Sequence, residues 1–151
     1  MYRYREIFVS VVGALAIAAC GDDPTSPEVV PCTAETSSVT ATVDAGQSVV
    51  FDWEPACGVA MLLVEEDASD MWGISTDEAT WTRPDQGNLI TPPVTYGVTP
   101  SGVTEFQEPL TFVAGGAYEL ILWRILPEGS QAQCEERFGN LCLLTVHPFT
   151  R

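Results

Sequence analysis

The chain has 151 residues, with 21 acidic side chains against six arginines, no lysine, and a formal net charge of −15 at pH 7. Proteins bind nucleic acid and anionic lipid headgroups through basic surfaces, so this charge balance excludes both as ligands recognised by charge. Hydrophobic residues make up 46% of the chain, which is enough for one packed domain.

The first nineteen residues have the composition of an export signal. Arg3 and Arg5 give a positive start, and the apolar stretch at 7–19 has the length of a signal-peptide core. A membrane-spanning helix needs about 20 apolar residues, and two aspartates follow this shorter run almost at once. We therefore expect residues 1–19 to be a signal peptide.

The end of that run, Ile17-Ala18-Ala19-Cys20, resembles a bacterial lipobox, in which an aliphatic residue and two small residues precede an acylated cysteine. The resemblance implies cleavage before Cys20, a diacylglyceryl group and an N-linked fatty chain such as palmitate on Cys20, and a lipid anchor outside the cytoplasm. An anchor with more than one fatty chain meets the requirement for stable attachment to a membrane. The outer membrane, the periplasmic face and the cell surface all stay open as locations. The alternative is an ordinary secretory signal, cut after Ala19 or Ala18, that leaves Cys20 a plain thiol.

Residues 20–31 contain three prolines and almost no aliphatic periodicity, which predicts a flexible linker. Residues 32–151 then form one domain, of a size that can bury a core. After removal of residues 1–19, four arginines stand against 20 acidic side chains, a net charge of −16. Such a charge favours solubility and attracts cations or basic partners.

The folded segment has the period-two alternation of strands and lacks a convincing helical period, apart from one possible turn at 131–138. We expect strands at 38–43, 48–53, 59–64, 71–75, 94–99, 117–126 and 141–147. The run at 59–64 is continuously apolar, as in a central strand, and a proline-bearing loop spans 76–93. About seven strands separated by turn signals predict an all-β fold, a single antiparallel β-sandwich.

The segment from Phe112 to Tyr118, FVAGGAY, is similar to the E–F corner of fibronectin type III and immunoglobulin-like domains. The resemblance implies that the Tyr118 hydroxyl hydrogen-bonds back to the corner backbone and that Phe112 belongs to the core. It also implies an immunoglobulin/fibronectin type III-like fold over 38–147. Ala114 replaces the proline usual in the fibronectin version, and a sandwich of another topology is the alternative.

Four cysteines follow Cys20: Cys32, Cys57, Cys134 and Cys142. An even number in an oxidising compartment predicts two disulfides, with three possible connectivities. In the strand order of the resembled family all four lie at one end of the sandwich. That favours Cys32–Cys57 and Cys134–Cys142, with pairing across the two sets as the alternative. The absence of a CxxC pair disfavours zinc.

Glu65, Glu66, Asp67 and Asp70 form the densest acidic cluster. Clustered carboxylates bind calcium, and paired ones act as acid and base in glycoside hydrolysis. The cluster lacks EF-hand spacing, so these four are weak calcium candidates. The favoured interpretation is a solvated loop at the end of a strand.

No nucleophile elbow, phosphate-cradling loop or HExxH motif occurs in the sequence, and its one histidine, His147, lies in the closing strand. We therefore expect neither an enzyme nor a cofactor.

Arg124, on a strand of large apolar residues, is expected to form a salt bridge with Glu65 or Glu119.

Trp72 and Trp81 flank the irregular middle, where partial exposure and burial in the core, the commoner position of tryptophan in a small sandwich, are the alternatives; Trp53 and Trp123 are expected in the core. The first functional hypothesis is a non-catalytic envelope lipoprotein that binds an envelope or extracellular protein or stiffens an envelope assembly. The second is a carbohydrate-binding module in which Trp72 and Trp81 stack on a glycan beside carboxylates. A hydrolase is the third.

Overall fold

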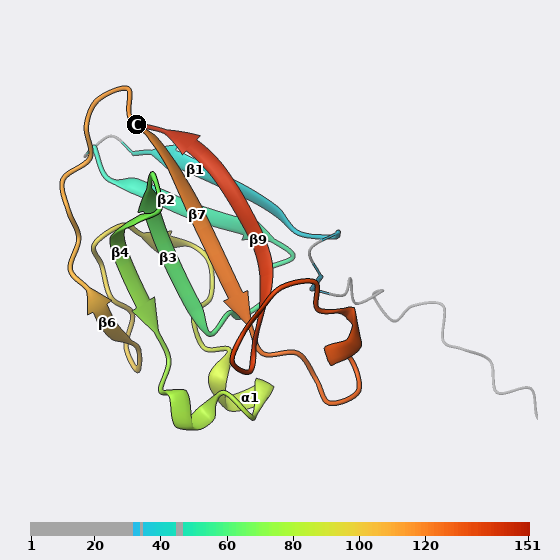
Figure 1. Cartoon of the computed structure of the whole chain (residues 1–151). Coiled ribbons are helices and arrows are strands. Elements are labelled where there is room, and N and C mark those ends of the chain that lie inside the picture. Colours follow the sequence, from blue (N-terminus) through green and yellow to red (C-terminus); the bar gives the residue numbers. More distant parts are fainter. Residues whose placement is uncertain (1–31, 34, 45–46) are drawn as a thin grey trace, which may run out of the picture.

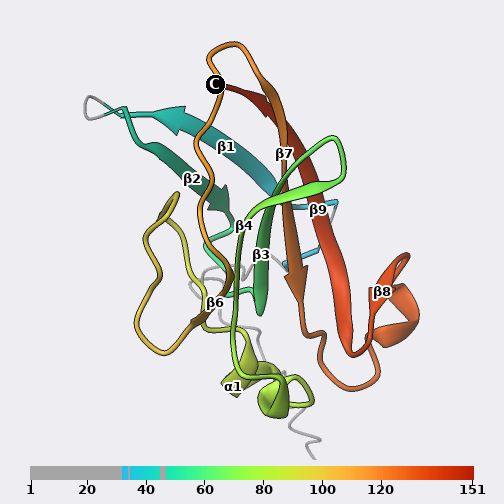
Figure 2. The same cartoon turned by 60° about the vertical axis from the view of Figure 1, so that its left-hand side comes forward.

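The computed structural model describes residues 32–33, 35–44 and 47–151, so the predicted signal peptide and linker, with Cys20, lie outside the described residues. The described chain is all-β, with nine strands in two antiparallel sheets, as predicted (Figure 1). The smaller sheet has the order β1-β2-β5 and the larger sheet the order β6-β4-β3-β7-β9-β8. Figure 2 shows β1 running beside β2 in the smaller sheet.

The strands are β1 (Ser38–Val43), β2 (Val49–Glu54), β3 (Met61–Glu66), β4 (Ser69–Ser75), β5 (Val94–Thr95), β6 (Thr104–Gln107), β7 (Ala117–Arg124), β8 (Arg137–Phe138) and β9 (Leu141–Thr150). The helical turns are η1 (Glu78–Thr80), α1 (Pro84–Gly87) and η2 (Gln131–Gln133). The strand β1 has its predicted bounds, and the ends of β2, β3, β4, β7 and β9 lie within three residues of theirs.

The sequence prediction was wrong about the extent of β5 and missed β6 and β8. The strand β5 ends at Thr95, because the chain turns at Gly97, where φ is +74°. The strand β6 carries a single large apolar side chain, Phe106, which lies on Gly73 of β4, so closely that a Cβ on Gly73 would collide with the ring. Val59, predicted to lie in a strand, forms only an isolated bridge to Ile90.

The core lies between the two sheets and is built by alternation along the strands. Phe51 and Trp53 of β2 and Leu120 and Leu122 of β7 are each at most 1% exposed, as period two requires when one face of a sheet is buried. The Trp53 indole N–H donates to the Cys57 carbonyl at 2.8 Å. Burial of each large apolar side chain stabilises the fold by about 1.5–3 kcal/mol.

A second apolar cluster covers the outer face of the larger sheet at one end. Its members are Ala60, Met61, Trp81, Trp123, Ile125 and Leu141. The Phe138 ring of β8 lies over this cluster, with its centroid 6.3 Å from that of Trp81 and 6.1 Å from that of Trp123. The segment that carries η1 and α1 therefore packs on the sheet and does not form a free loop.

Both predicted disulfides are present. Cys32 pairs with Cys57 and Cys134 with Cys142, with Cα–Cα distances of 6.2 Å and 5.5 Å. Both lie at the end of the sandwich where β3 and β9 begin and β7 ends. Loop-closure entropy gives them about 3.5 and 2.5 kcal/mol of stabilisation, respectively.

The predicted tyrosine corner forms immediately before β7. Tyr118 is 2% exposed, and its hydroxyl oxygen accepts a hydrogen bond from the Val113 N–H at 2.7 Å. The Phe112 ring packs edge-on against Tyr118, with 4.6 Å between centroids. A Cβ on Gly116 would collide with the Tyr118 hydroxyl, so a glycine is required for this close approach.

We expect Tyr118→Phe to lower the free energy of unfolding by about 0.5–1.5 kcal/mol, because it removes one hydrogen bond and leaves the ring packed. Tyr118→Ala also leaves a cavity and should cost about 3–5 kcal/mol. Chemical denaturation of both variants measures the two losses. Negligible losses in both would contradict a stabilising corner.

Candidate functional site

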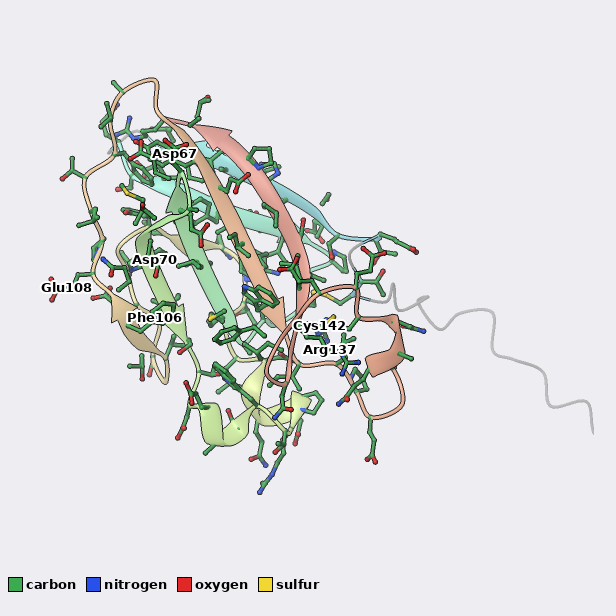
Figure 3. The ribbon with its side chains drawn as sticks, in the orientation of Figure 1. Asp67, Asp70, Phe106, Glu108, Arg137 and Cys142 are labelled. Carbon is green, nitrogen blue, oxygen red and sulfur yellow. A yellow bond between two sulfur atoms is a disulfide. The ribbon has the colours of Figure 1, made fainter. Side chains whose placement is uncertain are left out.

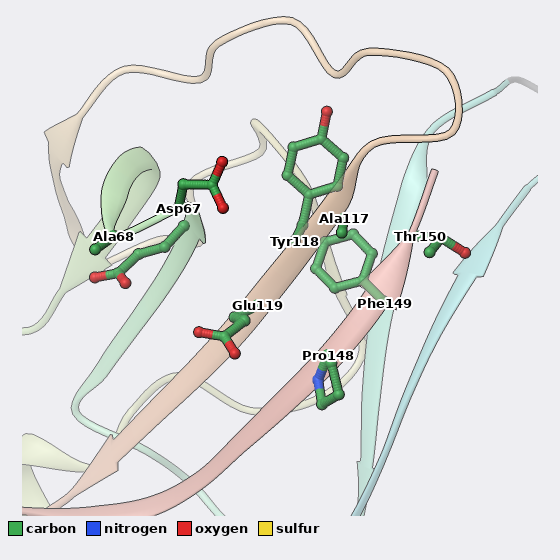
Figure 4. A pocket seen from close by; sticks show the side chains of 9 residues that line it. Asp67, Ala68, Ala117, Tyr118, Glu119, Pro148, Phe149 and Thr150 are labelled. Atoms are coloured by element: carbon green, nitrogen blue, oxygen red, sulfur yellow. The ribbon is translucent and has the colours of Figure 1, made fainter.

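A surface depression of about 460 Å³ lies at the end of the sandwich opposite the disulfides (Figure 4). It forms where the β3–β4 turn, the start of β7 and the end of β9 meet. Its lining residues are Glu65, Asp67, Ala68, Ala117, Tyr118, Glu119, Pro148, Phe149 and Thr150. Figure 3 shows Asp67 at this end of the molecule and Cys142 toward the other.

The β3–β4 turn places Asp67 at the rim. Two residues, Asp67 and Ala68, connect the strands, with φ values of +49° and +61°. Two positive φ values are typical of a type I′ hairpin, whose twist matches that of the flanking strands. Aspartate tolerates this conformation, whereas alanine is strained in it because its Cβ crowds the backbone.

The sheet register sets three carboxylates in a row beside the depression. Asp70 of β4 lies opposite Glu65 of β3, and Glu65 lies opposite Glu119 of β7. Residues directly opposite each other point to the same face of a sheet, where like charges repel. On the far side of Glu119 the partner is Pro148, so this register supplies no basic side chain to the row.

Burial raises the pKa of Glu65, and the charges of Asp70 and then Glu119 raise it further. The carboxylate of Glu65 is therefore partly desolvated and faces two like charges across the neighbouring strands. Together with Asp67 at the rim, this gives the depression a negative potential that attracts positive charge.

The structure corrects the interpretation of the acidic cluster as a solvated loop. Glu65 and Glu66 belong to β3 and Asp70 to β4, and only Asp67 lies in the turn. Within the described residues, no group of three or more acidic, histidine or cysteine side chains is arranged to hold a metal ion. The calcium assignment therefore gains no support. Glu119 could not be assigned to this cluster from the sequence, because only the pairing of β3 with β7 brings it there.

Of the two alternatives for Trp72 and Trp81, the structure shows burial and not partial exposure. Trp72 is fully buried in the core, and its indole N–H donates to a Glu105 carboxylate oxygen at 2.9 Å. Trp81 is 8% exposed, packs in the second cluster, and donates to the Thr76 hydroxyl oxygen at 3.3 Å. Neither ring offers an open face on which a sugar could stack.

The expected salt bridge of Arg124 was wrong. Arg124 lies opposite Cys142 at the disulfide end of β7, whereas Glu119, which lies opposite Glu65, is five residues away toward the other end. Burial lowers the pKa of Arg124, and its Nε and Nη1 atoms are buried without a hydrogen-bond partner in the described structure. His147, half-buried in β9, lies opposite Leu120.

No known protein family, curated protein or solved structure matches the chain. None of the helices in the described residues is long and apolar enough to cross a bilayer. Assignment of function therefore depends on the chain's own geometry and sequence motifs.

We expect Glu65→Gln to raise the free energy of unfolding at neutral pH, because it removes a charge that burial and two neighbours disfavour. Because the pKa of Glu65 is higher in the folded state, the native protein binds the Glu65 proton more tightly than the unfolded chain does. The wild type therefore loses stability as the pH rises and this carboxyl group ionises. The stability gained by Glu65→Gln should accordingly shrink as the pH is lowered toward about 4. Denaturation across this pH range measures it.

Glu66→Gln is the matched control, because Glu66 is the next residue on the same strand. An equal gain in the free energy of unfolding in both variants, or a gain in Glu65→Gln that does not change with pH, would contradict the conclusion that burial and like charges disfavour the ionised Glu65.

We expect Ala68→Gly to stabilise the domain by about 0.5–1 kcal/mol, because glycine adopts a positive φ without strain. Ala117→Gly, in β7 on the same depression, should destabilise by a similar amount. Thermal or chemical denaturation distinguishes the two signs, and a loss of stability in Ala68→Gly would show that the turn is unstrained.

Proposed function

We propose that this protein is an envelope lipoprotein, anchored through Cys20, whose β-sandwich is a non-catalytic interaction module of the immunoglobulin/fibronectin type III-like kind. The observation that carries the module assignment is the tyrosine corner within this strand order. The strands β1-β2-β5 correspond to A-B-E, and β4-β3-β7-β9 correspond to C′-C-F-G. The strands β6 and β8 are additions at the two edges of the larger sheet.

The two disulfides support export, because such bonds persist in oxidising compartments. The lipobox supports the anchor. Eleven residues lie between Cys20 and Cys32, a length of chain that spans at most about 40 Å. Cys32 is bonded at the disulfide end, so the chain from the proposed anchor enters the domain at that end and not at the depression.

The arrangement of the carboxylates supports binding of a positively charged partner. Asp70, Glu65 and Glu119 lie side by side on one face of a sheet, and the register brings no basic side chain to the row. Such a row acts through its summed charge on a basic partner.

We expect Cys20→Ala to leave an unprocessed precursor or to release the protein from membranes, because the variant lacks the acylated residue. Membrane fractionation and incorporation of labelled palmitate measure the effect. The double variant Cys134→Ser/Cys142→Ser, which removes two other cysteines, should fractionate like the wild type. A Cys20→Ala protein that is processed and membrane-bound would rule out lipidation.

A further inference from the structure

The outer edge of the smaller sheet is formed by β1. This strand pairs with β2 through six consecutive residue pairs without a bulge, and it has no other strand partner in the described structure. An unpaired edge offers a row of backbone donors and acceptors to any extended chain that reaches it.

Two hydrogen bonds show which residues of β1 direct their backbone groups to that edge. The Asp44 N–H donates to the Ser48 carbonyl across the hairpin at 2.9 Å, so Asp44 faces β2. The Tyr96 N–H donates to the Val49 carbonyl at 2.8 Å, so Val49, which lies opposite Val43, faces away from β1. Backbone groups alternate in direction along a strand. The N–H and C=O groups of Val39, Ala41 and Val43 therefore point to the open edge.

The strand β1 lacks the features that normally protect an edge. Its sequence, SVTATV, contains no charge, proline or glycine, and consists largely of β-branched residues. The other exposed edges of the described structure are protected or short. The strand β9 carries Pro148, β6 has four residues including Glu105, and β5 and β8 have two residues each.

The surface beside β1 is acidic. Asp52 and Glu54 of β2 are exposed and lie opposite Thr40 and Ser38 of β1. A strand added to β1 would place alternate side chains about 10 Å from these carboxylates, within reach of lysine or arginine. A second copy of the chain would bring the same acidic residues and a strongly negative net charge, and would be repelled.

We propose that the β1 edge binds an extended segment of a partner protein that carries lysine or arginine at alternate positions, added to the smaller sheet as a further strand. Main-chain hydrogen bonds to Val39, Ala41 and Val43 supply affinity, and Asp52 and Glu54 select the basic side chains. This inference rests on the proposed interaction function, for which it names the partner chemistry.

The test uses the full chain in neutral detergent and a fluorescent, capped peptide of alternating lysine and valine, with fluorescence anisotropy as the measurement. The wild type should bind it with a dissociation constant below about 1 mM, and a peptide with glutamate in place of lysine should bind at least about tenfold more weakly. Ala41→Pro removes an open-edge N–H without breaking a β1–β2 bond and should weaken binding about tenfold. Ala41→Gly, which keeps the N–H, is the matched control and should retain binding.

The double variant Asp52→Asn/Glu54→Gln should weaken binding of the lysine peptide and make that binding less dependent on salt concentration.

If Ala41→Pro fails to fold, a lysine peptide N-methylated at alternate amides replaces that variant in the test and should have lower affinity for the wild type than the unmethylated peptide. Equal binding by Ala41→Pro and Ala41→Gly, equal binding of the N-methylated peptide, or no binding of the lysine peptide overturns the proposal. So does a dimer in sedimentation that Ala41→Pro dissociates, because the occupant is then a second copy. None of these outcomes changes the fractionation of Cys20→Ala, so failure here is distinguishable from failure of the anchor.

Discussion

Burial of the Tyr118 ring, with its hydroxyl oxygen hydrogen-bonded to the Val113 N–H, fixes where the chain enters β7, and the geometry of the larger sheet follows from that point. Tyr118 is the second residue of β7, so its anchoring sets the register of the strand against β3. A slip of one residue would transfer every side chain of β7 to the opposite face. Leu120 and Leu122 would then leave the core, and Glu119 would enter it.

The same register accounts for the unfavourable clustering of like charges at the candidate site. With Tyr118 directed inward, Glu119 is directed outward and lies opposite Glu65. The sheet thus holds like charges close together, and the pKa of Glu65 is raised first by burial and then by the neighbouring carboxylates of Asp70 and Glu119. Ala68 adds backbone strain at the adjacent turn. Local conflicts of this kind, within an otherwise consistent fold, are expected at functional surfaces.

Features that depend on local pattern were predictable from the sequence, and features that depend on long-range pairing were not. Alternation in β2 and β7 gave the strands and their buried faces, and the glycine-tyrosine spacing before β7 gave the corner. The strand β6 has one large apolar residue and depends on contact with Gly73 of β4, about thirty residues away in sequence, so no local signal marks it.

The sequence-based site failed for the same reason. The sequence left partial exposure of Trp72 open because it borders an irregular segment, yet its indole is hydrogen-bonded to Glu105, 33 residues further along the chain. The acidic cluster was visible, but its extension to Glu119 required the β3–β7 pairing. Arg124 could be matched with glutamates by charge alone, whereas its register places it at the disulfide end, opposite Cys142.

The three surfaces differ in how strongly the fold fixes their position. The disulfide end is cross-linked twice, and the chain that follows the predicted linker enters the domain there. The depression lies at the far end of the same strands, on a face whose charges the sheet register fixes. The β1 edge runs along the smaller sheet, where hydrogen bonding is incomplete on one side. For the proposed basic partner the two sites would act differently, because fixed charge attracts a basic chain from a distance, whereas unpaired backbone groups bind it only at contact.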